Sequence, residues 1–90
     1  MTVDVGQWLE ENGYDGVKYL TDFSYDSAFI GMTWDDRCVY DYNKMVQWIV
    51  ETQGWDELEA VEWIEYNTIR ALPYMGEGAP IVMYGVELDE

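Results

Sequence analysis

The run "WDELEAVEWIEYN", residues 55–67, opens with the clearest helix-start signal in the chain. Asp56 can accept a hydrogen bond from the free N–H groups at a helix start, and Glu59 completes a capping box three residues later. Because a proline disfavours helical backbone in the residue before it, the helix should end at about Leu72, before Pro73. This run therefore predicts one continuous helix over residues 56–72.

Two further helix starts are visible upstream. Asp4 can cap a short helix that ends before Gly13, and Asp41 can cap a longer one that ends at about Thr52, before Gly54. The longer segment has an apolar stripe at helical spacing, formed by Tyr42, Met45, Val46 and Ile49.

Between these helices the segments "SAFIGMT" and "RCVYD" are rich in β-favouring residues, and "WDD" between them supplies turn chemistry. With Asp35 and Asp36 at the tip, the predicted hairpin register places Trp34 opposite Arg37, Met32 opposite Val39, and Ile30 opposite Asp41. Residues 17–20 are interpreted as a short strand within a loop, and "IVMYGV" as a final strand joining the hairpin sheet. The predicted fold class is α+β: a small antiparallel sheet of three to four strands packed with two main helices and a short N-terminal helix, in one domain spanning residues 1–90.

The charge of the chain is strongly one-sided. Nineteen Asp and Glu stand against four Lys and Arg, for a net charge of −15 without any His. Such a charge opposes direct binding to nucleic acid or anionic lipid and favours a basic protein partner. Solubility and adaptation to high salt are the two other interpretations. With 49% hydrophobic and 17% aromatic residues, the chain should fold rather than remain a disordered acidic tail.

The sequence offers little for catalysis, and we predict no enzyme activity, cofactor or metal. Lack of His removes the histidine base and the imidazole metal site, although a carboxylate pair holding a metal stays open as a third interpretation. The single cysteine, Cys38, is interpreted as an inert strand residue of a cytoplasmic protein. We expect neither a signal peptide nor a membrane span, because the start lacks a basic and apolar leader and no apolar run approaches about 20 residues.

The helix over residues 56–72 should present an acidic, aromatic face to solvent. Glu59 and Glu62 are three residues apart and therefore neighbours on one ridge. Glu65 lies at the rim of the apolar face, where it either reaches water or pairs with a cation such as Arg70 or Arg37. The residues predicted to point outward are Glu59, Glu62, Trp63, Tyr66 and Arg70, with Arg70 stacking on Tyr66.

The segments "GMTWDDRCVYDYNKMVQWIVE" and "AVEWIEYNTIRALPYMGEGAPIVMY", within residues 31–84, resemble a family of small acidic proteins of unassigned function encoded by bacteriophages and prophages. The most distinctive part is "YNTIRALPY" followed by "GEGAPIVMY". The resemblance implies a phage context, in which short acidic single-domain proteins are often inhibitors of host defence, such as anti-CRISPR or anti-restriction proteins. It implies no catalytic residues.

The leading hypothesis is a non-enzymatic, anti-CRISPR-like inhibitor of a bacterial defence nuclease, an acidic mimic of nucleic acid that binds a basic groove of its target. The alternative is a small homodimeric structural or regulatory protein without a nuclease target. The loop after Pro73 is interpreted either as a plain crossover or as a docking loop. The predicted partner-binding residues are Asp35, Asp36, Glu59, Glu62, Trp63, Glu65, Tyr66 and Glu77.

Overall fold

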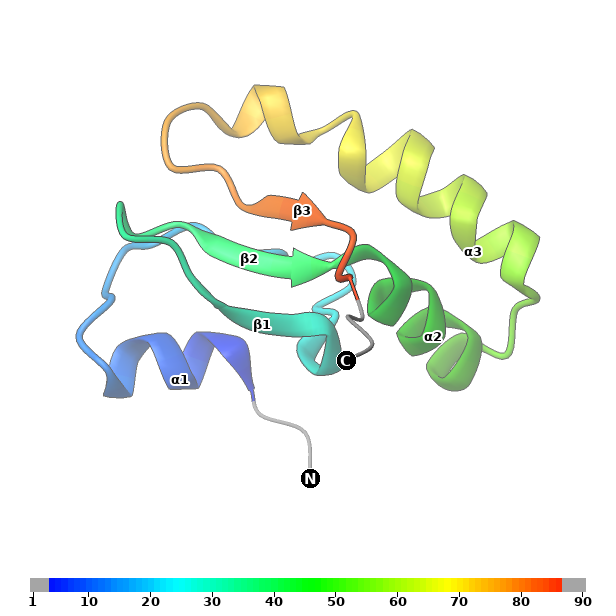
Figure 1. The fold of residues 1–90 in the computed structure, drawn as a ribbon, viewed down its shortest axis with the longest axis horizontal. Coiled ribbons are helices and arrows are strands. Elements are labelled where there is room, and N and C mark those ends of the chain that lie inside the picture. Colours follow the sequence, from blue (N-terminus) through cyan, green and yellow to red (C-terminus); the bar gives the residue numbers. More distant parts are fainter. Residues whose placement is uncertain (1–3, 87–90) are drawn as a thin grey trace.

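The computed structural model of the chain describes residues 4–86 and confirms the α+β fold class (Figure 1). The part described contains three α-helices and three strands. In chain order they are α1 (Val5–Glu11), β1 (Phe29–Met32), β2 (Cys38–Asp41), α2 (Tyr42–Gln53), α3 (Glu57–Trp63) and β3 (Ile81–Met83). None of these helices combines the length and apolarity that a membrane span needs.

All three predicted helix starts are confirmed. Each cap is an aspartate whose carboxylate accepts a hydrogen bond from the N–H three residues later, at N···O distances between 2.8 and 3.1 Å. The three caps are Asp4, Asp41 and Asp56. Gly54 ends α2 with a φ of 71°, a left-handed conformation that glycine adopts without steric cost.

The sheet has the strand order β1-β2-β3, with β2 in the centre. β1 pairs with β2 in the antiparallel sense, but β3 runs parallel to β2, so the antiparallel orientation predicted for the third strand is wrong. Figure 1 shows the cause: α2 leaves the end of β2, and α3 carries the chain back toward the end where β2 begins. A parallel pair requires a crossover of this kind.

The hairpin exists, but its predicted register is wrong. Met32 pairs with Cys38 rather than with Val39. The reason lies in the turn, where the N–H of Thr33 donates to the carbonyl of Arg37 at 2.8 Å and leaves a three-residue loop. The last residue of this loop, Asp36, has a φ of 63°, the left-handed position expected in three-residue hairpin loops. A second irregularity lies within β1 and shifts the pairing again.

Residues 17–20 do not form the predicted strand; they belong to an irregular segment between α1 and β1. This segment is tied to the sheet by the N–H of Leu20, which donates to the hydroxyl of Tyr40 at 3.2 Å. Because Tyr40 is fully buried, the bond fixes the segment against the sheet.

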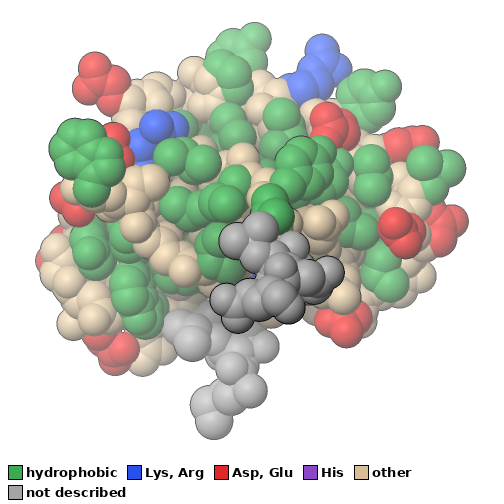
Figure 2. Space-filling view, in the orientation of Figure 1, with side chains coloured by type: hydrophobic (Ala, Val, Ile, Leu, Met, Phe, Trp, Pro, Cys, Tyr) green, Lys and Arg blue, Asp and Glu red, His purple; other side chains and the backbone are tan. Residues whose placement is uncertain are grey.

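The two faces of the sheet differ in what covers them. On one face Cys38 and Tyr40 are completely buried, in a core cluster that also contains residues of α1, α2, α3 and the irregular segment. On the other face Ile30 and Met83 remain 44% and 42% exposed. Figure 2 looks onto this open face, where hydrophobic side chains gather over the strands and carboxylates lie mainly around the margin.

The predicted continuous helix over residues 56–72 is wrong beyond Trp63. The chain continues as a π-helical segment, Ile64–Ile69, and then as a 3₁₀ turn, Leu72–Met75. Regular helical spacing would place both Thr68 and Ala71 inward; Thr68 is buried, but Ala71, just after the π-helical segment, is exposed.

Candidate functional site

Four of the predicted contact residues meet around one shallow hollow on α3 and the π-helical segment. The hollow has a volume of about 290 Å³. Its walls are Trp55, Glu59, Glu62, Trp63, Tyr66 and Asn67. Glu59 and Glu62 are exposed, as predicted, and the Tyr66 ring is 65% exposed. We refer to this hollow as the acidic hollow.

Trp63 was predicted to point outward but is half-buried. Its ring centroid lies 5.0 Å from that of Phe23 and 5.7 Å from that of Trp55. Phe23 also contacts Trp48, at 5.5 Å. Trp63 is therefore a fixed wall of the acidic hollow, held by an aromatic cluster, rather than a freely protruding anchor.

Arg70 stacks on Tyr66, as predicted. The guanidinium carbon lies 5.7 Å from the centroid of the ring, within the range of a cation–π contact. One face of Tyr66 is thus occupied by the chain's own cation.

Glu65 does not belong to the acidic hollow. Its carboxylate accepts a hydrogen bond from the hydroxyl of Tyr42 at 2.7 Å, so its partner is a tyrosine rather than the cations considered from the sequence. The bond joins the π-helical segment to the start of α2. Burial raises the pKa of the Tyr42 hydroxyl, and the hydrogen bond to Glu65 raises it further.

The remaining predicted contacts lie elsewhere. Asp35 and Asp36 are exposed in the β1–β2 turn, next to Trp34, which is 95% exposed. The Asp35 carboxylate accepts a hydrogen bond from the Thr33 hydroxyl. Figure 1 places this turn at the end of the sheet opposite α2. Glu77 is exposed in the loop before β3 and does not line the acidic hollow.

Two of the four cations are used to hold the loop before β3. The Lys18 ammonium donates to the backbone carbonyls of Met75 and Glu77, the latter at 2.8 Å. The Arg37 Nε donates to the carbonyl of Ala79 at 2.8 Å. In these bonds Lys18 and Arg37 donate to backbone carbonyl oxygens rather than to carboxylates.

Sequence reasoning missed a second hollow, which shares Trp63 and Asn67 with the acidic hollow. Its other walls come largely from residues 19–25, the part of the chain with no helical or strand periodicity. A density of aromatic residues in an aperiodic segment was the available signal: Tyr14, Tyr19, Phe23 and Tyr25 all fall within it.

Two features bear on metal binding and thiol chemistry in the described residues. Across residues 4–86, no three His, Cys, Asp or Glu side chains gather as a metal site would require. Cys38 is buried, and burial raises the pKa of its thiol to about 11, so the reactive thiolate is scarce at neutral pH. No protein-family model matches the chain, and no curated protein or solved structure shows significant similarity to it.

Proposed function

We propose that this protein is a non-enzymatic inhibitor of a bacterial defence nuclease, of the anti-CRISPR type, that binds a basic nucleic-acid groove of its target in the bacterial cytoplasm. The acidic hollow is the proposed contact surface. Its exposed carboxylates take the place of phosphates, and its aromatic walls take the place of bases.

One observation carries the proposal: three of the four cations of the chain already have a partner within the fold. Lys18 and Arg37 donate to backbone carbonyls, and Arg70 lies over the Tyr66 ring. Nineteen carboxyl groups against four cations therefore leave a surface that a lysine- and arginine-rich partner can neutralise.

The rigidity of the acidic hollow supports the same role. Glu59 lies in the first turn of a helix capped by Asp56, and Trp63 is held by Phe23 and Trp55. Groups fixed before binding lose little conformational entropy when a partner docks. The inhibitor would occupy the groove before nucleic acid enters and would undergo no chemical change.

The test uses a panel of purified CRISPR effectors and restriction endonucleases. Each is incubated with the protein before labelled DNA is added, and cleavage is measured over a range of salt concentrations. We expect inhibition of at least one nuclease, with an affinity that falls steeply as salt rises.

A matched pair of variants separates the acidic hollow from bulk charge. Glu59→Gln with Glu62→Gln removes two charges at the hollow, and Glu10→Gln with Glu11→Gln removes two exposed charges on α1. The first pair should weaken inhibition about tenfold more than the second, because charges at a contact cost more than remote ones. Equal effects of the two pairs, or no inhibition across the panel, would refute the proposal.

The homodimer alternative is favoured by a different observation, the open face of the sheet. Ile30 and Met83 are exposed there, and Tyr84 and Val86 follow at 64% and 76% exposure. Apolar groups gathered on one face are typical of an interface. Light scattering distinguishes the two functions, since a mass equal to one chain at every concentration would exclude the dimer.

A further inference from the structure

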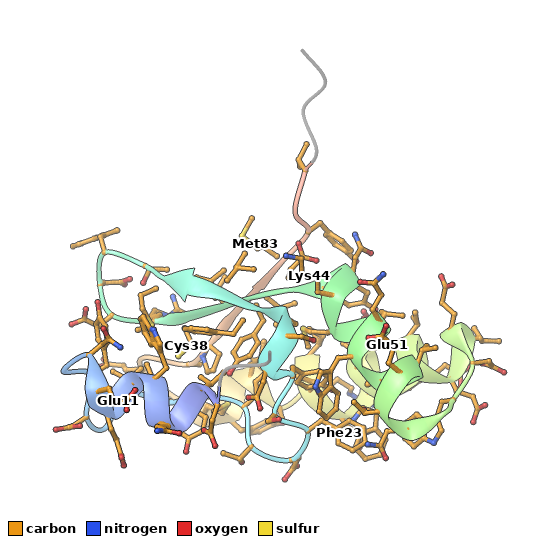
Figure 3. The ribbon with its side chains drawn as sticks, turned by 90° about the horizontal axis from the view of Figure 1, so that it is seen from below. Glu11, Phe23, Cys38, Lys44, Glu51 and Met83 are labelled. Carbon is orange, nitrogen blue, oxygen red and sulfur yellow. The ribbon has the colours of Figure 1, made fainter. Side chains whose placement is uncertain are left out.

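The second hollow lies on the side of the molecule opposite the open sheet face. Figure 3 shows Phe23, one of its walls, on the far side of the sheet from Met83. The hollow has a volume of about 210 Å³ and lies between residues 19–25 and the π-helical segment. Because Trp63 and Asn67 belong to both hollows, the two lie next to each other.

Four aromatic residues are among those that line this hollow. Tyr19, Phe23, Tyr25 and Trp63 line it together with Asp22 and Asn67. No Lys or Arg is among its lining residues. Aromatic faces combined with a carboxylate form the chemistry that attracts an organic cation.

Two backbone irregularities meet at this hollow. Tyr25 has a φ of 50°, a left-handed conformation that is unfavourable for a bulky residue, and Thr68 lies in the π-helical segment. The two are joined by a buried hydrogen bond of 2.9 Å between the Tyr25 hydroxyl and the Thr68 hydroxyl. Strained residues and π turns concentrate at functional sites, and here both line the same hollow.

The volume of the hollow indicates what size of group it can hold. The hollow is smaller than the pockets of about 300–1,000 Å³ that hold drug-sized molecules and cofactors. An apolar cavity of about 150 Å³ is enough for a benzene-sized group. At about 210 Å³, this hollow has room for the end of one large side chain.

We propose that the second hollow is a receptor for the guanidinium group of an arginine side chain on the basic partner. The planar guanidinium would lie against the aromatic walls, with its charge toward Asp22. Guanidinium suits this site better than ammonium because it is weakly hydrated and stacks on aromatic rings. The inference rests on the proposed function, since the basic groove supplies the arginine, and it extends the contact surface past Trp63 from the acidic hollow.

The test needs no nuclease. The ¹⁵N-labelled protein is titrated with N-ethylguanidinium chloride, and NMR follows the indole N–H of Trp63 and the side-chain amide of Asn67. N-ethylurea, of similar shape but uncharged, is the matched ligand, and sodium chloride at equal concentration is the ionic reference. We expect both signals to shift and saturate with the guanidinium probe alone, at concentrations on the order of millimolar.

Two conservative variants complete the test. Asp22→Asn should weaken binding of the probe roughly two- to fivefold, the effect of losing one solvent-facing charge partner. Asp15→Asn makes the same chemical change at an exposed position outside this hollow and should leave binding unchanged. Equal responses to both probes, no saturable shift, or equal binding by both variants would overturn the inference.

The outcome is separable from the test of the proposed function. Guanidinium binding without inhibition of any nuclease would support the guanidinium site and refute the proposed inhibitor function. Inhibition without guanidinium binding would support the proposed inhibitor function and refute the guanidinium site.

Discussion

Asp41 joins three parts of the fold through one carboxylate. It is the last residue of β2 and is 9% exposed. One carboxylate oxygen accepts from the N–H of Lys44 at 3.0 Å and caps α2, while the other accepts from the N–H of Gly85 at 3.1 Å, just after β3. Replacing Asp41 therefore tests a cap and a strand anchor together.

The expected loss of stability follows from these two bonds. Removing a helix cap costs about 1 kcal/mol, and the bond to Gly85, which is exposed, contributes about 1 kcal/mol more. Asp41→Ala should thus lower the free energy of unfolding by about 2 kcal/mol. For a domain of this size that corresponds to a fall in Tm of about 8–16 °C. Asp41→Asn keeps the cap but turns an N–H donor toward Gly85, so it should cost about 1 kcal/mol.

The measurement is urea and thermal unfolding, followed by circular dichroism and tryptophan fluorescence. Asp56→Ala is the matched control, because Asp56 caps α3 in the same way without a second bond to a distant N–H. It should cost about 1 kcal/mol, half the loss at Asp41. If Asp41→Ala costs no more than Asp56→Ala, the carboxylate does not anchor the segment after β3 and the reasoning fails.

Two further predictions concern alkaline stability and the loop before β3. Burial raises the pKa of the Cys38 thiol from 9.0 to about 11, so the unfolded chain loses this proton at a lower pH than the folded chain does. The free energy of unfolding should therefore fall by about 1.4 kcal/mol per pH unit as pH rises from 9 to 11. This fall is the contribution of Cys38 alone; burial also raises the pKa of the Tyr25, Tyr40 and Tyr42 hydroxyls, which add to the fall toward pH 10.5. Urea titrations at pH 8 and 10.5 measure the total fall, which Cys38→Ala should make shallower. An unchanged slope in this variant would contradict the assignment. Lys18→Met should speed hydrogen exchange about fivefold at Ala79, whose N–H donates to Gly76 within the loop that Lys18 holds, while α2 keeps its protection. Equal exchange in the variant and the parent would show that the lysine does not hold this loop.

Local signals in the sequence were sufficient for the helix starts. Asp4, Asp41 and Asp56 each act through an N–H three residues away, so the pattern needs nothing from the rest of the fold. The hairpin was also predictable, because its strands are adjacent in the chain. Its register was not, since that depended on Asp36 adopting a left-handed conformation, which glycine would have signalled more strongly.

Features that depend on distant contacts were not predictable from local pattern. The orientation of β3 is set by where α3 returns the chain, and the π-helical segment is accompanied by packing of Ile64 in the core and by the bond between Thr68 and Tyr25. Neither the orientation of β3 nor the π-helical segment can be predicted from the spacing of apolar residues.

The same distinction between local signals and long-range contacts applies to the candidate site. Glu59 and Glu62 are exposed neighbours because both lie on α3, where helical spacing determines their positions. Trp63 is half-buried because Phe23, forty residues earlier in the chain, packs against it. The second hollow depends on the same long-range contact, so the aromatic residues of the irregular segment could signal that it packs but not where.

The parallel pairing of β2 and β3 also has a consequence for biosynthesis. β2 is the central strand, yet its second neighbour is made only after both crossover helices. A ribosome adds about 5–20 residues per second, so the hairpin and α2 leave the exit tunnel seconds before β3 does. During that interval one side of β2 has no strand beside it. Completion of the sheet is therefore a late event in the life of the nascent chain, and stalled translation before β3 would leave an open β2 edge prone to aggregation.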